Sequence, residues 1–193
     1  MRVAALYDIH GNLPALEAVL ADVRRAGVEL VVVGGDVLPG PIPRECLEVL
    51  QGLSLPVHYL RGNGDRVVLS VVRGEMPDEV PAAFQEVVRW NAAQLTPAQC
   101  SAIAEWPMTI RHRVPGVGDV LFCHATPRSD IETITRRTDE SKLANAIEAV
   151  QASLVVCGHT HMPYERTVGS VRVVNAGSVG MPFGAPGAYW LLL

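Results

Sequence analysis

Five short segments of the chain carry carboxylate, amide and imidazole side chains that could build a metal site. Four of the six histidines fall in these segments, and each segment follows an apolar stretch typical of a β-strand. The segments are Asp8-Ile9-His10-Gly11-Asn12, Gly34-Gly35-Asp36, Gly62-Asn63-Gly64-Asp65, Cys123-His124 and Gly158-His159-Thr160-His161. Two divalent cations held roughly 3.5–4 Å apart need such a mixture, with one bridging carboxylate. The pattern therefore predicts a dinuclear metal centre.

The donor types also narrow the choice of metal. Imidazole and carboxylate suit manganese, iron, nickel and zinc, and the near absence of thiolate argues against a structural zinc. His159 and His161 are one residue apart and would share a face of an extended segment, while Gly158 would leave space for a ligand beside the backbone. We expect two divalent ions, with manganese as the first choice and iron, nickel, zinc or magnesium as alternatives.

The order of the five motifs resembles that of the calcineurin-like metallophosphoesterases, over nearly the whole chain from Arg2 to the terminal strand. The resemblance implies a four-layer α/β/β/α sandwich with the metals between the sheet edges. It implies one metal held by Asp8, His10 and His161, a second held by Asn63, His124 and His159, and Asp36 as the bridge. It thereby makes Asp36, Asn63 and His124 the expected catalytic residues.

One position departs from the family pattern. The fourth motif of the family reads Gly-Asn-His followed by an acidic residue, and the resemblance implies that this histidine protonates the leaving group. Gly64 stands there in this chain. The chain therefore lacks the usual general acid, a role worth roughly 10²–10⁴-fold in rate. His58 and His112 are alternative acids, although a histidine on the surface of a strand is the simpler interpretation of each. Asp65 is expected to cap the helix that follows.

Three arginines lie near the motifs, namely Arg61, Arg66 and Arg128. Each could contact phosphate oxygens through two hydrogen bonds, or could be a solvated surface residue, and the sequence does not decide between these alternatives. The glycine-containing segment 175–180 follows a predicted strand. Its backbone amides could point toward the site, but a structural turn is the favoured interpretation.

The expected activity follows from the metals. We expect a phosphoric ester hydrolase in which a hydroxide held by both cations attacks phosphorus in line. Phosphodiesters or nucleoside polyphosphates are the first choice of substrate, and phosphomonoesters are the second. The rival hypothesis is a protein-interaction module of the same fold, as in a retromer subunit of similar fold. Intact ligands without turnover of any phosphoester would favour that alternative.

Composition sets the remaining limits. A chain of 193 residues, of which 49% are hydrophobic and 19% charged, predicts a single domain over residues 1–193 with a substantial core. A net charge of −4 argues against extended nucleic-acid binding. No apolar run approaches the roughly 20 residues that cross a bilayer, and no signal peptide is evident, so a cytoplasmic protein without a membrane partner is expected. A small phosphoester or nucleotide is the expected partner, and a homo-oligomer is left open.

The apolar patterns predict an α/β class with two unlike halves. The first half alternates strands and helices, and the second is mostly strands with one helix, which suggests two packed sheets with helices outside. Asn12 and Thr96 are expected helix N-caps. Strands are expected at 3–7, 30–33, 56–60, 109–114, 120–123, 154–157, 163–168, 171–174 and 188–193, and helices at 13–26, 43–50, 81–95, 97–105 and 141–150.

Overall fold

The computed structural model describes residues 1–193, which form nine strands and six helices. The strands are β1 (Val3–Leu6), β2 (Leu30–Val33), β3 (Val57–Tyr59), β4 (Thr109–Val114), β5 (Gly118–Cys123), β6 (Leu154–Cys157), β7 (Tyr164–Val168), β8 (Val171–Asn175) and β9 (Leu191–Leu192). The helices are α1 (Leu13–Arg25), α2 (Pro43–Gln51), α3 (Asn63–Val72), α4 (Ala82–Gln94), α5 (Pro97–Ala104) and α6 (Glu140–Ile147).

The strands form two mixed sheets. The first has the order β3-β2-β1-β9, in which β1, β2 and β3 are parallel and β9 is antiparallel to β1. The second has the order β4-β5-β6-β8-β7, with β5, β6 and β8 parallel and an antiparallel strand at each edge. Central strands such as β1 and β6 are buried along their whole length, as expected for parallel strands covered on both faces.

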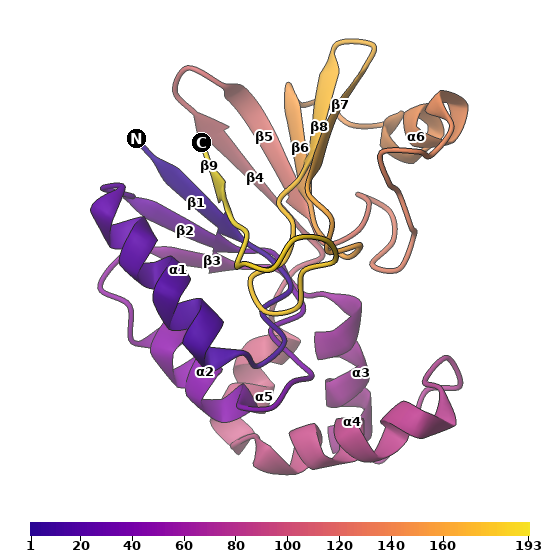
Figure 1. The fold of residues 1–193 in the computed structure, drawn as a ribbon. Coiled ribbons are helices and arrows are strands. Elements are labelled where there is room, and N and C mark those ends of the chain that lie inside the picture. The colour runs from indigo at the N-terminus through magenta and orange to yellow at the C-terminus, as the bar shows by residue number, and fades with distance from the viewer.

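The helices and the two sheets form four layers (Figure 1), and three apolar clusters lie between them. The middle cluster joins the facing sides of the two sheets through residues such as Tyr7 and Phe122. A larger cluster joins the other side of the first sheet to the N-terminal helices, and includes Leu16 and Leu47. A third cluster packs α6, through Leu143, against the outer side of the second sheet. The fold is therefore the expected sandwich of two sheets with helices outside.

The predicted helix signals are confirmed. Asn12 caps α1 by accepting a hydrogen bond from the N–H of Ala15, and Thr96 caps α5 in a reciprocal arrangement with Gln99. The last strand differs from the prediction, because β9 contains only two residues instead of the six expected at 188–193. The N–H of Tyr189 donates to the carbonyl of Ser178, so this part of the chain is bonded to a loop and not to the sheet.

The parallel strands of both sheets end at the same place, and this is what positions the predicted ligands. In Figure 1 the two sheets diverge away from a common edge, and helices α3, α4 and α5 gather beneath it. Loops that follow β1, β2, β3, β5, β6 and β8 meet at this edge, which is where α/β sheets place ligands. No helix in the structure is both long enough and apolar enough to cross a lipid bilayer.

Candidate metal centre

All seven predicted ligands lie at the common edge of the two sheets. Asp8 and His10 follow β1, Asp36 follows β2, and His124 follows β5 directly. His159 and His161 follow β6, and Asn63 is the first residue of α3. The sequence indicated the strand ends correctly but did not predict that a ligand would begin a helix.

One group of ligand atoms surrounds Asp8, His10 and His161. Nε2 of His10 lies 3.2 Å from Nε2 of His161, and Oδ1 of Asp8 lies 3.5 Å from the same His161 nitrogen. All three residues present ligand atoms within 4.8 Å of one another. Two imidazole nitrogens and a carboxylate oxygen at such distances suit a single divalent cation.

A second group forms around His124. Oδ1 of Asn63 lies 3.0 Å from Nε2 of His124. If the amide turned over, its nitrogen would lie 3.0 Å from His124 and 3.1 Å from Nδ1 of His159. The amide and both imidazoles therefore converge on one point. Without a metal the NH₂ group can donate to both rings, whereas an ion at that point would need the amide oxygen.

Asp36 lies between the two groups. Its Oδ2 is 3.8 Å from Nε2 of His10 and 3.5 Å from Nε2 of His124. Its other oxygen, Oδ1, accepts a hydrogen bond of 2.7 Å from the N–H of Gly64. A carboxylate that is held through one oxygen and faces ligands of both groups with the other is suited to sharing two ions.

The buried carboxylates of the centre depend on positive charge nearby. Asp8 is fully buried, and its Oδ1 has no hydrogen-bond partner. Burial disfavours the charged forms of Asp36 and His124, yet the two charges stabilise each other. The pKa of Asp36 consequently falls below its ordinary value, and the pKa of His124 rises to about 10. Since a buried carboxylate oxygen without a donor is costly, Oδ1 of Asp8 and the carboxylate of Asp36 fit bound divalent cations, which would take the place of a charged imidazole.

The backbone at the ligands is strained. Five residues other than glycine have a positive φ in the chain, and all five are predicted ligands: Asp8 (53°), His10 (46°), Asp36 (51°), His159 (66°) and His161 (57°). Such a conformation costs a residue with a side chain about 1–2 kcal/mol. Strain of this kind persists where the surrounding structure enforces it, and it concentrates at functional sites. No sequence pattern predicted these positive φ angles.

Asp65 supports the loop that carries Asp36. Its Oδ2 accepts from the N–H of Gly62 at 3.0 Å and from the N–H of Asp36 at 2.8 Å, and its Oδ1 accepts from Leu38 at 3.0 Å. The bond from Gly62 is the predicted helix cap, and the other two were not foreseen. Burial, followed by the negative charge of Asp36, raises the pKa of Asp65 to about 7. This carboxyl group therefore fixes the start of α3 and the Asp36 loop together.

The segment at 175–180 supports Asp8 and His161. The amides of Ala176, Val179 and Gly180 bond to backbone carbonyls and that of Gly177 to Oδ1 of Asn175, so none of the four bonds to a ligand side chain, which favours the structural interpretation. The hydroxyl of Ser178 donates to the carbonyl of Asp8 at 2.7 Å. The carbonyl of Met181 lies 2.7 Å from Nδ1 of His161, which leaves Nε2 of that ring for the metal side. Sequence reasoning missed Ser178 because a serine after a strand has no signal of its own.

A family model described as the calcineurin-like phosphoesterase superfamily domain matches residues 1–193. The chain belongs to this superfamily. It is therefore a metal-dependent phosphoric ester hydrolase. The phosphodiesterase YfcE of Escherichia coli K12 is 25% identical over 100% of this chain and 87% of its own length.

Solved structures also resemble the phosphoesterase. A metallophosphoesterase from Sphaerobacter thermophilus aligns with a TM-score of 0.77 at 27% identity, over 100% of this chain and 83% of its own. A hypothetical protein from Pyrococcus horikoshii aligns with a TM-score of 0.81 at 20% identity, over 94% of this chain and 78% of its own. The second likeness concerns the fold alone.

Gly64 has no room for the general acid that the family motif carries. The residue is buried, and a Cβ atom there would lie 2.2 Å from the carbonyl oxygen of Leu38 and 3.0 Å from Oδ1 of Asp36. An imidazole would fit only if the loop that holds Asp36 moved. The glycine is thus part of how the phosphoesterase packs α3 against its ligand loop.

The two alternative acids lie elsewhere. His58 and His112 face each other with ring centroids 6.0 Å apart, on the edge strands β3 and β4. His58 precedes Asn63 by five residues of largely extended chain, which separates them by on the order of 15 Å. His112 pairs with Val120, four residues before His124. Neither imidazole reaches the centre, which agrees with the simpler interpretation of each as a strand histidine and argues against the alternative of a substitute acid.

The three arginines proposed for substrate binding differ in their surroundings. Arg66 donates from Nε to Asp130 at 2.6 Å and from Nη1 to Glu79 at 2.8 Å. Arg128 donates to both carboxylate oxygens of Glu132, at 2.9 and 2.6 Å. These acidic partners occupy the guanidinium edges that a phosphate would need, which argues against the predicted role for both residues. Arg61 is half-buried beside the metal motif and has no such partner, so it remains a candidate.

Removal of bound metal should lower the melting temperature of the phosphoesterase by about 5–10 °C for each ion lost, without unfolding it at room temperature. An ion present at 100 times its Kd adds about 2.7 kcal/mol of stability, and each kcal/mol shifts the melting temperature of a domain of this size by about 2–4 °C. The three apolar clusters do not depend on the metals. Calorimetry before and after chelation would measure the shift, and unchanged melting after verified metal removal would contradict it.

Proposed function

We propose that this phosphoesterase hydrolyses phosphodiesters or nucleoside polyphosphates at a dinuclear centre. Asp8, His10 and His161 would hold one ion, Asn63, His124 and His159 the other, and Asp36 would bridge them. The observation that carries the proposal is the buried, unpartnered Oδ1 of Asp8 amid imidazole nitrogens. A buried carboxylate oxygen without a donor is costly, and a cation is the partner that this set of side chains can accommodate.

The bound ions and the surrounding residues would have different roles in the reaction. When bound, two divalent cations, manganese first, would supply an activated water and neutralise charge that develops on the phosphoryl oxygens. Asp36 would fix their separation, since its carboxylate is held by the N–H of Gly64. Burial, and then the nearby His124, lower the pKa of His159, which keeps that ring neutral and able to bind metal.

The leaving group separates the substrate classes. Since Gly64 offers no acid, the enzyme should favour esters whose leaving group is stable as an anion. Polyphosphate linkages and aryl diesters meet this condition, and unactivated alkyl monoesters do not. The phosphodiesterase name of the Escherichia coli relative agrees with this order of preference. Phosphomonoesters remain the second choice of substrate.

Metal-resolved turnover would test the proposal. The protein would be freed of metal, reloaded separately with manganese, iron, nickel, zinc and magnesium, and assayed against mono-, di- and polyphosphate esters. We expect two ions per chain and turnover of diesters or polyphosphates with at least one metal. Two bound ions without turnover of any ester would overturn the proposal and favour the protein-interaction module.

A further inference from the structure

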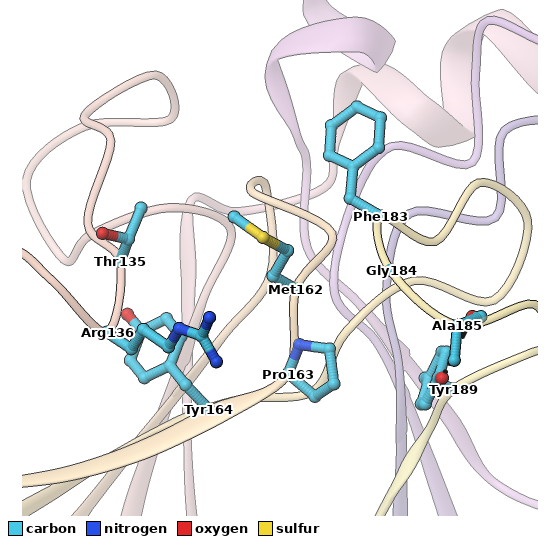
Figure 2. Close-up of a pocket in the computed structure, with 9 residues that line it drawn as sticks. All are labelled: Thr135, Arg136, Met162, Pro163, Tyr164, Phe183, Gly184, Ala185 and Tyr189. Atoms are coloured by element: carbon cyan, nitrogen blue, oxygen red, sulfur yellow. Dashed lines mark hydrogen bonds between the residues drawn. The ribbon is translucent and has the colours of Figure 1, made fainter.

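A pocket lies beside the metal centre, between the segment that joins β8 to β9 and residues 135–136 and 162–164. We call it the side pocket; it has a volume of about 260 Å³. It is lined by Thr135, Arg136, Met162, Pro163, Tyr164, Phe183, Gly184, Ala185 and Tyr189. In Figure 2, Thr135 and Arg136 form one wall, Phe183, Ala185 and Tyr189 form the other, and Met162 and Pro163 lie between them.

Phe183 connects the side pocket to the metal centre. Its ring stacks on the ring of His161, with centroids 5.2 Å apart and planes inclined by 26°. Its N–H donates to the carbonyl of His161 at 3.1 Å, which fixes it above that ligand. The side chain nevertheless remains 57% exposed. One ring thus contacts a candidate metal ligand and also presents surface to the pocket.

The lining suits one planar ring. The volume is below the roughly 300–1,000 Å³ of pockets that hold drug-sized ligands, so a single ring system is a suitable occupant. Phe183 offers an aromatic surface for stacking, and Met162, which is 39% exposed, lies between the walls with its polarisable thioether. The pocket is therefore largely apolar, with few polar groups, as small-molecule sites commonly are.

The opposite wall supplies a cation on a braced loop. Thr135 bonds to Thr138 through its N–H at 2.9 Å, and Arg166 donates to the carbonyl of Thr138. Arg136 lies between Thr135 and Thr138 in sequence. It is exposed, and its guanidinium has no acidic partner within the chain. An arginine that is free of acidic partners can stack on a ring or donate to ring nitrogens and oxygens.

We propose that the side pocket binds the base of a nucleotide whose phosphate lies at the metal centre. The proposal rests on the function proposed above, and it narrows the substrate class to nucleotide esters or polyphosphates. The base would stack on Phe183 and face Arg136. A spacer between ring and phosphate is required, because Phe183 and His161 separate the pocket from the ions, and a ribose provides one.

Titration calorimetry with three probes would test this proposal on the manganese-loaded protein. The probes are AMP, phenyl phosphate and inorganic phosphate. AMP should bind about 10-fold or more tighter than inorganic phosphate, because stacking on an aromatic side chain strengthens the binding of a base. Phenyl phosphate, which has no spacer, should bind no tighter than inorganic phosphate. Equal affinities for AMP and phenyl phosphate would overturn the nucleotide assignment.

Single variants would distinguish binding in the side pocket from binding at the metal centre. Phe183→Ala should weaken AMP binding by about 5- to 30-fold and leave metal content and inorganic phosphate binding unchanged. Arg136→Ala should weaken AMP binding less. Phe84→Ala, at a phenylalanine on α4 that is 60% exposed, is the matched control and should change nothing. An unaltered AMP affinity in Phe183→Ala would overturn the proposal.

Adenosine gives a measurement that does not depend on the metals. Titrated against the metal-free protein, it should bind weakly and lose that binding in Phe183→Ala. Suppose that inorganic phosphate failed to bind the manganese-loaded protein while adenosine bound in a way that depended on Phe183. This result would contradict the function proposed for the dinuclear centre and would support the base pocket. If phosphate bound while neither adenosine binding nor AMP binding depended on Phe183, the proposal of a base pocket would be overturned and the proposed metal centre would not be affected.

Discussion

Asp36→Asn should yield a folded protein that binds one divalent ion in place of two and turns over on the order of 10³-fold more slowly, since the metal supplies several kcal/mol of charge stabilisation. A neutral amide cannot share charge between two cations as a carboxylate does. The fold should survive, because the amide oxygen can still accept from the N–H of Gly64, as Oδ1 of Asp36 does. Metal content by mass spectrometry and steady-state kinetics measure the two effects.

The control for this variant must remove an aspartate charge without touching the centre. Asp119→Asn on β5 is suitable, since that side chain is 62% exposed and its ion pair is a long one to Arg113, at 3.9 Å. Asp65→Asn, which looks mild from sequence, is unsuitable: an amide nitrogen would face at least one of the three N–H groups that the carboxylate accepts. Two bound ions and near-normal turnover in Asp36→Asn would show that the ligand assignment is wrong.

The second large effect is a steep dependence of rate on the leaving group. With no imidazole at Gly64, esters that expel a basic alkoxide should react roughly 10²–10⁴-fold more slowly, relative to aryl esters, than in an enzyme with a positioned acid. A series of diesters with leaving groups of graded pKa, measured on the manganese-loaded enzyme, gives the slope directly.

A histidine introduced at Gly64 cannot serve as the complementary test, because its Cβ would lie 2.2 Å from the carbonyl oxygen of Leu38. Added imidazole buffer is the better probe. It should accelerate the alkyl esters most, since it supplies from solution the proton donor that the protein lacks. A flat slope in the wild-type enzyme, unaffected by imidazole, would mean that another group in the site donates the proton.

The sequence brought the candidate ligands to one place because most of them follow buried strands. Apolar runs such as 30–33 and 154–157 are strong signals, and residues after parallel strands must meet at one edge of the sheet. The same logic gave the two sheets and the helix caps at Asn12 and Thr96. These predictions depend on local patterns, and the tertiary contacts of the same residues agree with them.

Features of the site that depend on contacts between residues far apart in the sequence could not be predicted. Nothing near Ser178 indicates that its hydroxyl bonds to the carbonyl of Asp8, 170 residues away. The partners of Arg66 and Arg128 decide whether those charges are free, and side-chain pairing of this kind cannot be read from a motif. Gly64 could be identified as a missing acid, but the lack of space for any side chain there became visible only from the packing around Leu38.

The positive φ angles at five predicted ligands have a consequence for directed evolution. Glycine or asparagine would relax such a backbone position, so a screen that rewards heat resistance alone would favour substitutions at Asp8, His10 or His161. Each such substitution would delete a predicted metal ligand. Libraries built on this scaffold should therefore be selected with metal present and for turnover, or these positions should be held fixed, because substitutions that relax the backbone there would also remove predicted ligands.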